Sequence, residues 1–202
     1  MGFYSEKIIP LFYDKSMDKP HIENGRKEIL NDVSGNVLEI EFGTGLNLPH
    51  YPSTVNKLTI IDKNSGMNKK AQVRIQQSKI ESKVLNGEKL PFENESFDSV
   101  VSTYTLCSIK NINKALKEIY RVLKPDGKFF FHEHGLSNNP KVQMWQNFLN
   151  PFQKMWADGC HLNRDFKKLI EDSGFSFESY RNFVMEEDPK THGYMYEGIA
   201  VK

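Results

Sequence analysis

The sequence has few cysteines, almost no net charge and no long apolar run. Its 202 residues include only Cys107 and Cys160, too few for a disulfide framework, so we expect free thiols in a reducing, cytoplasmic setting. The 27 basic residues against 26 acidic ones give a net charge of +1, which argues against nucleic acid as a partner. No stretch reaches the roughly 18 to 20 apolar residues of a membrane span, and the start lacks a signal-peptide run. We therefore expect a soluble protein that acts on a small molecule, in an oligomeric state that the sequence leaves open.

The order of the apolar segments predicts an α/β fold with a mostly parallel sheet. From residue 35 onward, apolar runs alternate with segments of helical periodicity, which is typical of βαβ units. A helix is predicted over residues 112–123, where apolar residues recur every three or four positions before Pro125 and Gly127. Another helix over 163–172, ended by Gly174, should precede a closing pair of strands at 175–185 and 194–201. The expected strand cores, with intervening helices, are residues 37–40, 58–61, 84–85, 99–101 and 129–131.

Two segments depart from this alternation within what we expect to be a single domain, residues 1–202. The first, residues 1–34, is rich in aromatic and aliphatic side chains and is predicted to form a helical lid. The second, residues 140–161, carries an apolar stripe that includes Trp145 and Trp156 and is predicted to be an inserted cap, with a kink or two short helices at Pro151. The stripe could be a core helix, a lid over an apolar substrate or a membrane contact. The first two are favoured because a Lys/Arg-rich polar face is missing.

A glycine turn after the first strand indicates a nucleoside ligand. Gly43, Thr44 and Gly45 follow the strand directly, and Asp62 ends the next strand. Such glycines let the backbone approach a ligand, and the acid can accept both ribose hydroxyl protons. A dinucleotide fingerprint would have a third glycine where Leu48 stands, and no P-loop lysine follows. A nucleoside without a phosphate to bind points to S-adenosylmethionine.

These residues belong to a wider resemblance. The chain resembles the class I S-adenosylmethionine-dependent methyltransferases in five blocks that occur in the family's order: residues 39–45, Asp62, 86–92, 97–100 and 123–127. Within that family it looks most like the small methyltransferase-like proteins of animals that methylate alkyl thiols, and like bacterial relatives named as ubiquinone/menaquinone or phospholipid methyltransferases. This narrower resemblance is carried by Leu106, Cys107, Ser108, His134, Trp145, Gln146, Pro151, Asp158, Gly159, Cys160, Leu162, Arg164, Ala200, Val201 and Lys202.

The resemblance implies a Rossmann-like, seven-stranded, mostly parallel sheet with an antiparallel last strand and helices on both faces. It also implies S-adenosylmethionine as cofactor. Glu41 departs from the family, which has glycine there: its carboxylate could pair with the cofactor or block it. Asn86 stands where the family usually has an aspartate. The implied cofactor-binding residues are Tyr13, Glu39, Glu41, Gly43, Thr44, Gly45, Asp62, Lys63, Met67, Asn86, Gly87, Glu88, Thr103 and Tyr104.

The acceptor side is predicted from the end of the fifth strand and the cap. His134 ends that strand, at the carboxyl edge where such sheets place their sites, and is the candidate base or orienting residue. The other candidate substrate residues are Trp145, Asp158, Cys160 and His161. We expect no metal, because the histidine and cysteine positions lack the close spacing of a structural zinc site. The predicted reaction is methylation of a small hydrophobic acceptor, with an alkyl thiol favoured. Carbon methylation of a quinone precursor and a non-catalytic nucleoside-binding module are the alternatives.

Overall fold

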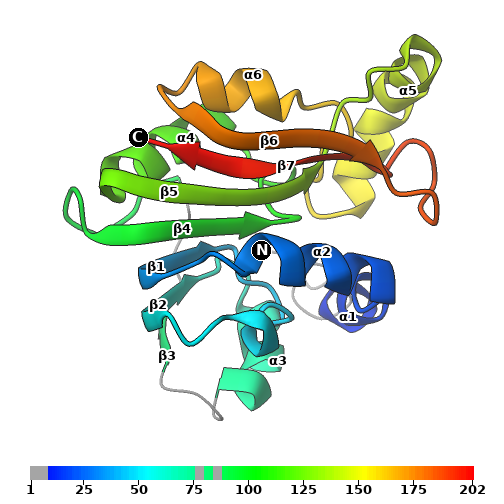
Figure 1. Ribbon diagram of the computed structural model, residues 1–202. Coiled ribbons are helices and arrows are strands. Elements are labelled where there is room, and N and C mark those ends of the chain that lie inside the picture. Colours follow the sequence, from blue (N-terminus) through cyan, green and yellow to red (C-terminus); the bar gives the residue numbers. More distant parts are fainter. Residues whose placement is uncertain (1–8, 76–79, 84–87) are drawn as a thin grey trace.

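A computed structural model describes residues 9–75, 80–83 and 88–202 as an α/β structure (Figure 1). Its sheet has seven strands in the order β3-β2-β1-β4-β5-β7-β6. All neighbours up to β5 pair in parallel, and β7 is antiparallel to both β5 and β6. The expected sheet, with its antiparallel last strand, is therefore confirmed. The strands are β1 Gly35–Ile40, β2 Val55–Ile61, β3 Ile80–Lys83, β4 Phe97–Thr103, β5 Leu123–His134, β6 Ser176–Val184 and β7 Tyr194–Val201.

Alternating apolar side chains put a separate core on each face of the sheet. Leu38 and Phe131 face a core that includes α4 (Ile112–Val122) and α6 (Phe166–Glu171). Their neighbours Val37 and Phe130 face the opposite core, which includes α2 (Pro20–Leu30) and α3 (Ser65–Ile75). A strand with both faces buried has to be apolar on both, which explains its continuous hydrophobic runs. The expectation of helices on both faces is confirmed.

One detail of the predicted strand and helix pattern lies outside the described residues, and another differs from the structure. The third strand is Ile80–Lys83, while the predicted core at 84–85 lies outside the described residues. The connection from β1 to β2 contains only the short 3-10 helix η2, Leu48–His50, in place of the expected full helix. Pro49 and Pro52 stand in this connection, and proline cannot supply the amide hydrogen that a continuing helix needs.

The N-terminal segment and the cap are both helical. The described part of the first segment forms α1 (Ile9–Met17) and α2, and Asp14 of α1 pairs with Lys70 and Arg74 of α3. The cap is one helix, α5 (Pro140–Trp156), which continues through Pro151. Of the two forms expected at Pro151, a kink or two short helices, the two short helices are wrong: proline removes a hydrogen bond from this helix without ending it. No helix in the described ranges is both long enough and apolar enough to cross a bilayer.

The apolar stripe of α5 is exposed, which contradicts a core role. Trp145 is 53% exposed and Phe148 63%. The helix is held instead by buried Gln146, which accepts from the amide of Ser137 and donates to the carbonyl oxygens of Gly135 and Thr191. The periodicity predicted the helix correctly. The helix is attached to the rest of the protein by the polar side chain of Gln146, so its apolar stripe can face outward.

Candidate active site

A cavity of about 490 Å³ lies at the carboxyl edge of β1, β2, β4 and β5. Parallel strands end at one edge, so residues just past their ends converge there. Figure 1 shows α1, α2 and α5 beyond this edge, and all three helices contribute to the lining. The volume is in the range of small-molecule sites. The residues of the predicted site that line it are Tyr13, Glu41, Gly43, Asp62, Lys63, Met67, Tyr104, His134, Asp158 and Cys160.

Asp62 and the glycine loop form one hydrogen-bonded unit. The two carboxylate oxygens of Asp62 accept from the amides of Gly43, at 2.7 Å, and Asn64, at 2.6 Å. Gly43 has φ +63°, and an added Cβ would lie 3.6 Å from the ring of Tyr13. Burial raises the pKa of Asp62 to about 6, against the lowering effect of the two amides. An ionised carboxylate has about four acceptor sites, so it can accept from a ligand's hydroxyl groups as well as from backbone amides.

A second, small polar pocket of about 10 Å³ adjoins the glycine loop and contains Glu39, Thr44 and Thr103. The Glu39 carboxylate accepts from Asn47, at 2.7 Å, and from the hydroxyl of Tyr51, at 2.7 Å. Burial raises the pKa of Glu39 to about 7. These predicted cofactor residues therefore lie behind the loop, where Glu39 and Asn47 hold its shape, and they do not line the larger cavity.

The backbone is left-handed at several non-glycine residues of the cavity wall. Glu41 has φ 51°, Tyr104 φ 54° and Asp158 φ 48°. Such a conformation costs an ordinary residue about 1 to 2 kcal/mol. The position of Glu41 thus suits the glycine that the family has there. Its carboxylate lies 3.7 Å from the Lys63 ammonium, which reduces the electrostatic cost of a negative charge in the cavity.

The loop after β4 brings Cys107 to the acceptor end of the cavity. Buried Glu133 accepts from the amides of Thr105 and Leu106, and its pKa is raised to about 7 by burial. The buried guanidinium of Arg164 donates to the carbonyl oxygens of Leu106 and Ile109. Both buried side chains hold the backbone on either side of Cys107, so this thiol has a fixed position.

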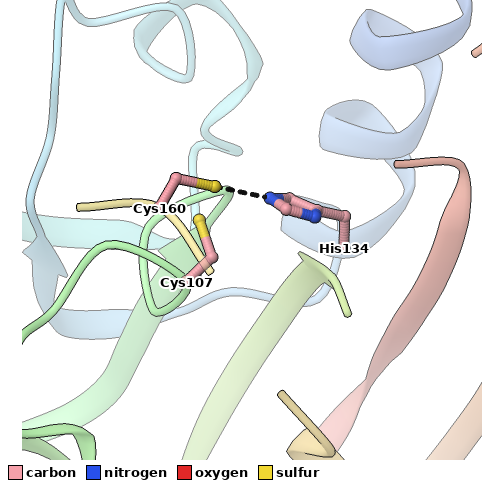
Figure 2. A group of neighbouring side chains, drawn as sticks. All are labelled: Cys107, His134 and Cys160. Atoms are coloured by element: carbon pink, nitrogen blue, oxygen red, sulfur yellow. Dashed lines mark hydrogen bonds between the residues drawn. The ribbon is translucent and has the colours of Figure 1, made fainter. Parts of the chain in front are cut away.

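Cys107, His134 and Cys160 form a buried cluster (Figure 2). The His134 Nε2 atom lies 3.2 Å from the Cys160 sulfur. The hydrogen bond from Cys160, together with the charge of His134, lowers the pKa of Cys107 well below its ordinary value. Burial lowers the pKa of His134, but the negative charge of Cys107, the hydrogen bond with Cys107 and the charges of Glu133 and Asp188 together outweigh it, so that this pKa is raised overall. The cluster therefore favours a thiolate at Cys107.

Several predicted residues lie away from the cavity. Trp145 and Trp156 are both more than half exposed on α5, and of these two only Trp156 borders the cavity. The His161 Nδ1 atom lies 3.0 Å from the carbonyl oxygen of Cys107, so this ring contacts the backbone of the loop. Gly45 packs against the ring of Phe42, and Glu88 accepts from the amide of Asn111. Asn86 and Gly87 lie outside the described residues.

Other lining residues were missed by the sequence analysis. Asp188 and His192 come from the connection between β6 and β7, where no local motif marks them. Asp188 also contacts Lys19 and His21 of the N-terminal segment, at 3.5 and 3.4 Å, which ties this connection to α2. Cys107 was not among the predicted site residues, although its place directly after β4, beside the strand that ends in His134, put it at the same sheet edge.

Comparisons with known proteins agree with this geometry. A family model described as a methyltransferase domain matches residues 38–131. Thiol S-methyltransferase TMT1B of Homo sapiens is 32% identical over 173 residues, which cover 77% of this chain and 69% of that protein. The Rattus norvegicus TMT1B is 37% identical over 152 residues, 72% of this chain and 61% of that protein, so the chain spans only about three fifths of that relative's length.

The solved structures show the same fold. An S-adenosylmethionine-dependent methyltransferase of Methanosarcina mazei superposes with a TM-score of 0.65 at 24% identity, over 91% of this chain and 97% of that one. The strand order, the glycine loop with Asp62 and the relatives agree. The chain therefore belongs to the class I S-adenosylmethionine-dependent methyltransferases and is similar to the thiol S-methyltransferases among them.

Proposed function

We propose that this protein transfers a methyl group from S-adenosylmethionine to the sulfur of a small, hydrophobic thiol. The observation that carries the proposal is one continuous cavity that joins Gly43 and Asp62 at one end to His134 and Cys160 at the other. Methyl transfer is an in-line displacement, which depends mainly on holding two reactants in one site. The relatives' names support the thiol as acceptor.

The cofactor end fits a nucleoside with an amino-acid tail. The Asp62 carboxylate would accept from the ribose hydroxyls, and the open backbone at Gly43 would lie against the ligand, since no Cβ occupies that space. The Asn47 side-chain oxygen is buried, and no described residue hydrogen-bonds it, so it could accept from a donor in the small pocket. When bound, S-adenosylmethionine supplies a methyl group activated by its sulfonium charge.

The acceptor end fits a molecule with an apolar body and one ionisable atom. Met17, Ile22 and Trp156 supply apolar walls. His134 is the residue that we propose to act on the acceptor, because its buried Nδ1 atom has no hydrogen-bond partner among the described residues. A thiol has to lose its proton before its sulfur can attack, and a positive charge or a hydrogen-bond donor nearby lowers the cost of that ionisation.

The test is release of S-adenosylhomocysteine in the presence of separate acceptors: a short alkyl thiol, a long alkyl thiol, the matching alcohols and a prenylated quinol. A phosphine has to be the reductant, because a thiol reductant would itself be an acceptor. We expect product with the thiols, more with the longer one, and none with the alcohols. Turnover of the quinol alone would establish the quinone alternative, and no turnover with any acceptor would overturn the proposal.

Glu41 decides between an enzyme and a non-catalytic binding module. Calorimetric titration with S-adenosylhomocysteine should show binding by the wild type, because Lys63 already pairs with the Glu41 carboxylate. Glu41→Gly should bind within a few fold of the wild type. Binding by Glu41→Gly with none by the wild type would show that Glu41 blocks the site, and the enzyme proposal would fail.

We also propose that the protein works in a reducing, cytoplasmic compartment, without nucleic acid as a partner. Support comes from the two buried cysteines, which are free thiols, and from the near-zero net charge. Fractionation of cells that express the tagged full chain, with the recovered protein tested for bound nucleic acid, checks both points.

A further inference from the structure

The three side chains of the Cys107, His134 and Cys160 cluster present their ligand atoms to one point. The two sulfur atoms and one imidazole nitrogen all lie within 4.8 Å of one another. Figure 2 shows the sulfurs and the edge of the ring turned toward each other. All three residues are buried, and all three line the large cavity. Such a group has the composition of a metal site with an open side.

The dimensions fit a tetrahedral zinc ion. Zinc binds thiolate sulfur at about 2.3 Å and imidazole nitrogen at about 2.0 to 2.1 Å, so the ligand atoms of one site lie roughly 3.5 to 3.8 Å apart. The observed separation of 3.2 Å between His134 Nε2 and the Cys160 sulfur, within a group no wider than 4.8 Å, requires only small movements to reach this geometry.

Each ligand is held by a different element, so the site is formed before any ion enters. Cys107 stands on the loop that Arg164 and Glu133 hold. Cys160 follows the tight turn after α5, in which the left-handed Asp158 and Gly159 reverse the chain. The expectation of no metal was drawn from ligand positions far apart in the sequence, whereas a site assembled from three separate segments does not need close spacing.

We propose that Cys107, His134 and Cys160 bind one zinc ion and leave its fourth position open to the cavity, where the acceptor's sulfur coordinates. Two cysteines and one histidine with an open position are a ligand set of catalytic zinc sites, and structural sites instead use four protein ligands. The ion itself is proposed on geometry alone. Its role toward a thiol acceptor rests on the proposed function.

The proposed reaction balances without an oxidant or reductant. The acceptor thiol releases its proton to solvent on coordination, because a metal deprotonates a bound thiol outright. The thiolate sulfur then forms a bond to the methyl carbon, the bond from that carbon to the sulfonium breaks, and its electron pair stays on the departing sulfur. The products are a thioether and S-adenosylhomocysteine, with one proton released overall. The unpartnered Nδ1 of His134 carries the ring's proton when Nε2 binds the ion.

The test measures the metal before any turnover. Purified full chain, reduced with a phosphine and freed of metal, is titrated with Zn²⁺ against a coloured chelator and, separately, with Co²⁺ in a spectrometer. We expect one ion per chain, a thiolate-to-cobalt charge-transfer band and the strong visible bands of tetrahedral cobalt. Cys107→Ser, Cys160→Ser and His134→Ala should each weaken binding at least tenfold, since each loses one of the protein ligands. His192→Asn is the matched control, because it removes another histidine of the same cavity and should leave one ion bound.

Two outcomes overturn the site: a wild type that binds no Zn²⁺, or binding that Cys160→Ser leaves unchanged. Circular dichroism of every variant identifies any that is misfolded, and the cobalt spectrum of the wild type tests the site without a substitution. The role is tested separately. An alkyl thiol should shift the cobalt bands in the absence of cofactor, and metal-free enzyme should lose thiol methylation. Metal binding without any thiol turnover would refute the proposed function and leave the site, whereas full turnover without metal would refute the role alone.

Discussion

The pH dependence of cofactor binding tests whether Asp62 receives the ribose. Asp62 lines the cavity with both oxygens engaged by backbone amides, and burial raises its pKa to about 6. Only the ionised carboxylate can accept from two hydroxyl groups without also donating. The affinity for the cofactor should therefore be highest above this pKa and should fall as the pH drops through it. With a pKa of about 6, the ionised fraction falls roughly elevenfold between pH 8 and pH 5, so Kd should rise about tenfold.

The assay is calorimetric titration with S-adenosylhomocysteine at half-unit steps from pH 5 to pH 8, with far-ultraviolet circular dichroism at each step as the folding control. Asp62→Asn should bind 10 to 100 times more weakly at pH 8, because a charge-assisted hydrogen bond contributes about 1.5 to 3 kcal/mol, and its affinity should be flat with pH. Lys63 and Asp158 both act on Asp62: the positive charge of Lys63 lowers its pKa and the negative charge of Asp158 raises it. A wild-type Kd that stays constant over this range, or Asp62→Asn that binds equally well, would refute the assignment.

Three further substitutions test the surroundings of the site. Glu39→Gln should gain stability relative to the wild type as pH rises, by about 2 to 3 kcal/mol between pH 5 and pH 8 in urea unfolding. A folded-state pKa of about 7 means that the stability from protonated Glu39 is lost as the pH rises through 7. Arg164→Lys should lower the free energy of unfolding by about 2 to 4 kcal/mol, because it leaves buried carbonyl oxygens without their donors. A loss below 1 kcal/mol would count against the role of Arg164 in holding the loop after β4. Phe148→Ser and Phe152→Ser should each change stability by less than about 0.5 kcal/mol, since both side chains are more than half exposed. A loss of 3 kcal/mol in the free energy of unfolding would instead indicate that the apolar stripe of α5 is packed in a core.

The fold was predictable because the apolar runs of its strands and the three-to-four-residue periodicity of its helices are both local features of the sequence. The apolar runs at residues 99–101 and 129–131 lie inside β4 and β5, and the periodic segment 112–123 matches α4, which Asn111 caps by accepting from the amide of Lys114. Gly43 and Asp62 were likewise predictable, because each follows the end of a strand, and these strands, β1 and β2, are consecutive and pair in the sheet. What failed was the surface of α5: periodicity shows that a helix has an apolar face, but not which neighbour covers it.

The acceptor end was only partly predictable, because it is assembled from segments far apart in the chain. Cys107 and Cys160 stand in two different connections, His134 stands at the end of β5, and Asp188 and His192 stand in a third connection. Their convergence depends on the lengths and paths of the loops between them. Strand order would have helped, since β4 and β5 are neighbours and their carboxyl ends place Cys107 beside His134.

The backbone of the cavity wall indicates that this edge of the sheet is selected for a purpose other than stability. Five non-glycine residues of the described ranges have positive φ, and Glu41, Tyr104 and Asp158 among them line the cavity. At about 1 to 2 kcal/mol each, these three cost the fold several kcal/mol that glycine would not. Glu41 and Asp158 bring carboxylate-bearing residues to the cavity lining, and the hydroxyl of Tyr104 lies 3.0 Å from Nε2 of His132. Strained residues persist where the surrounding structure fixes them and where their side chains are needed. We therefore propose that Glu41, with its carboxylate held beside Lys63, takes part in binding the ligand, as the titration of Glu41→Gly will test.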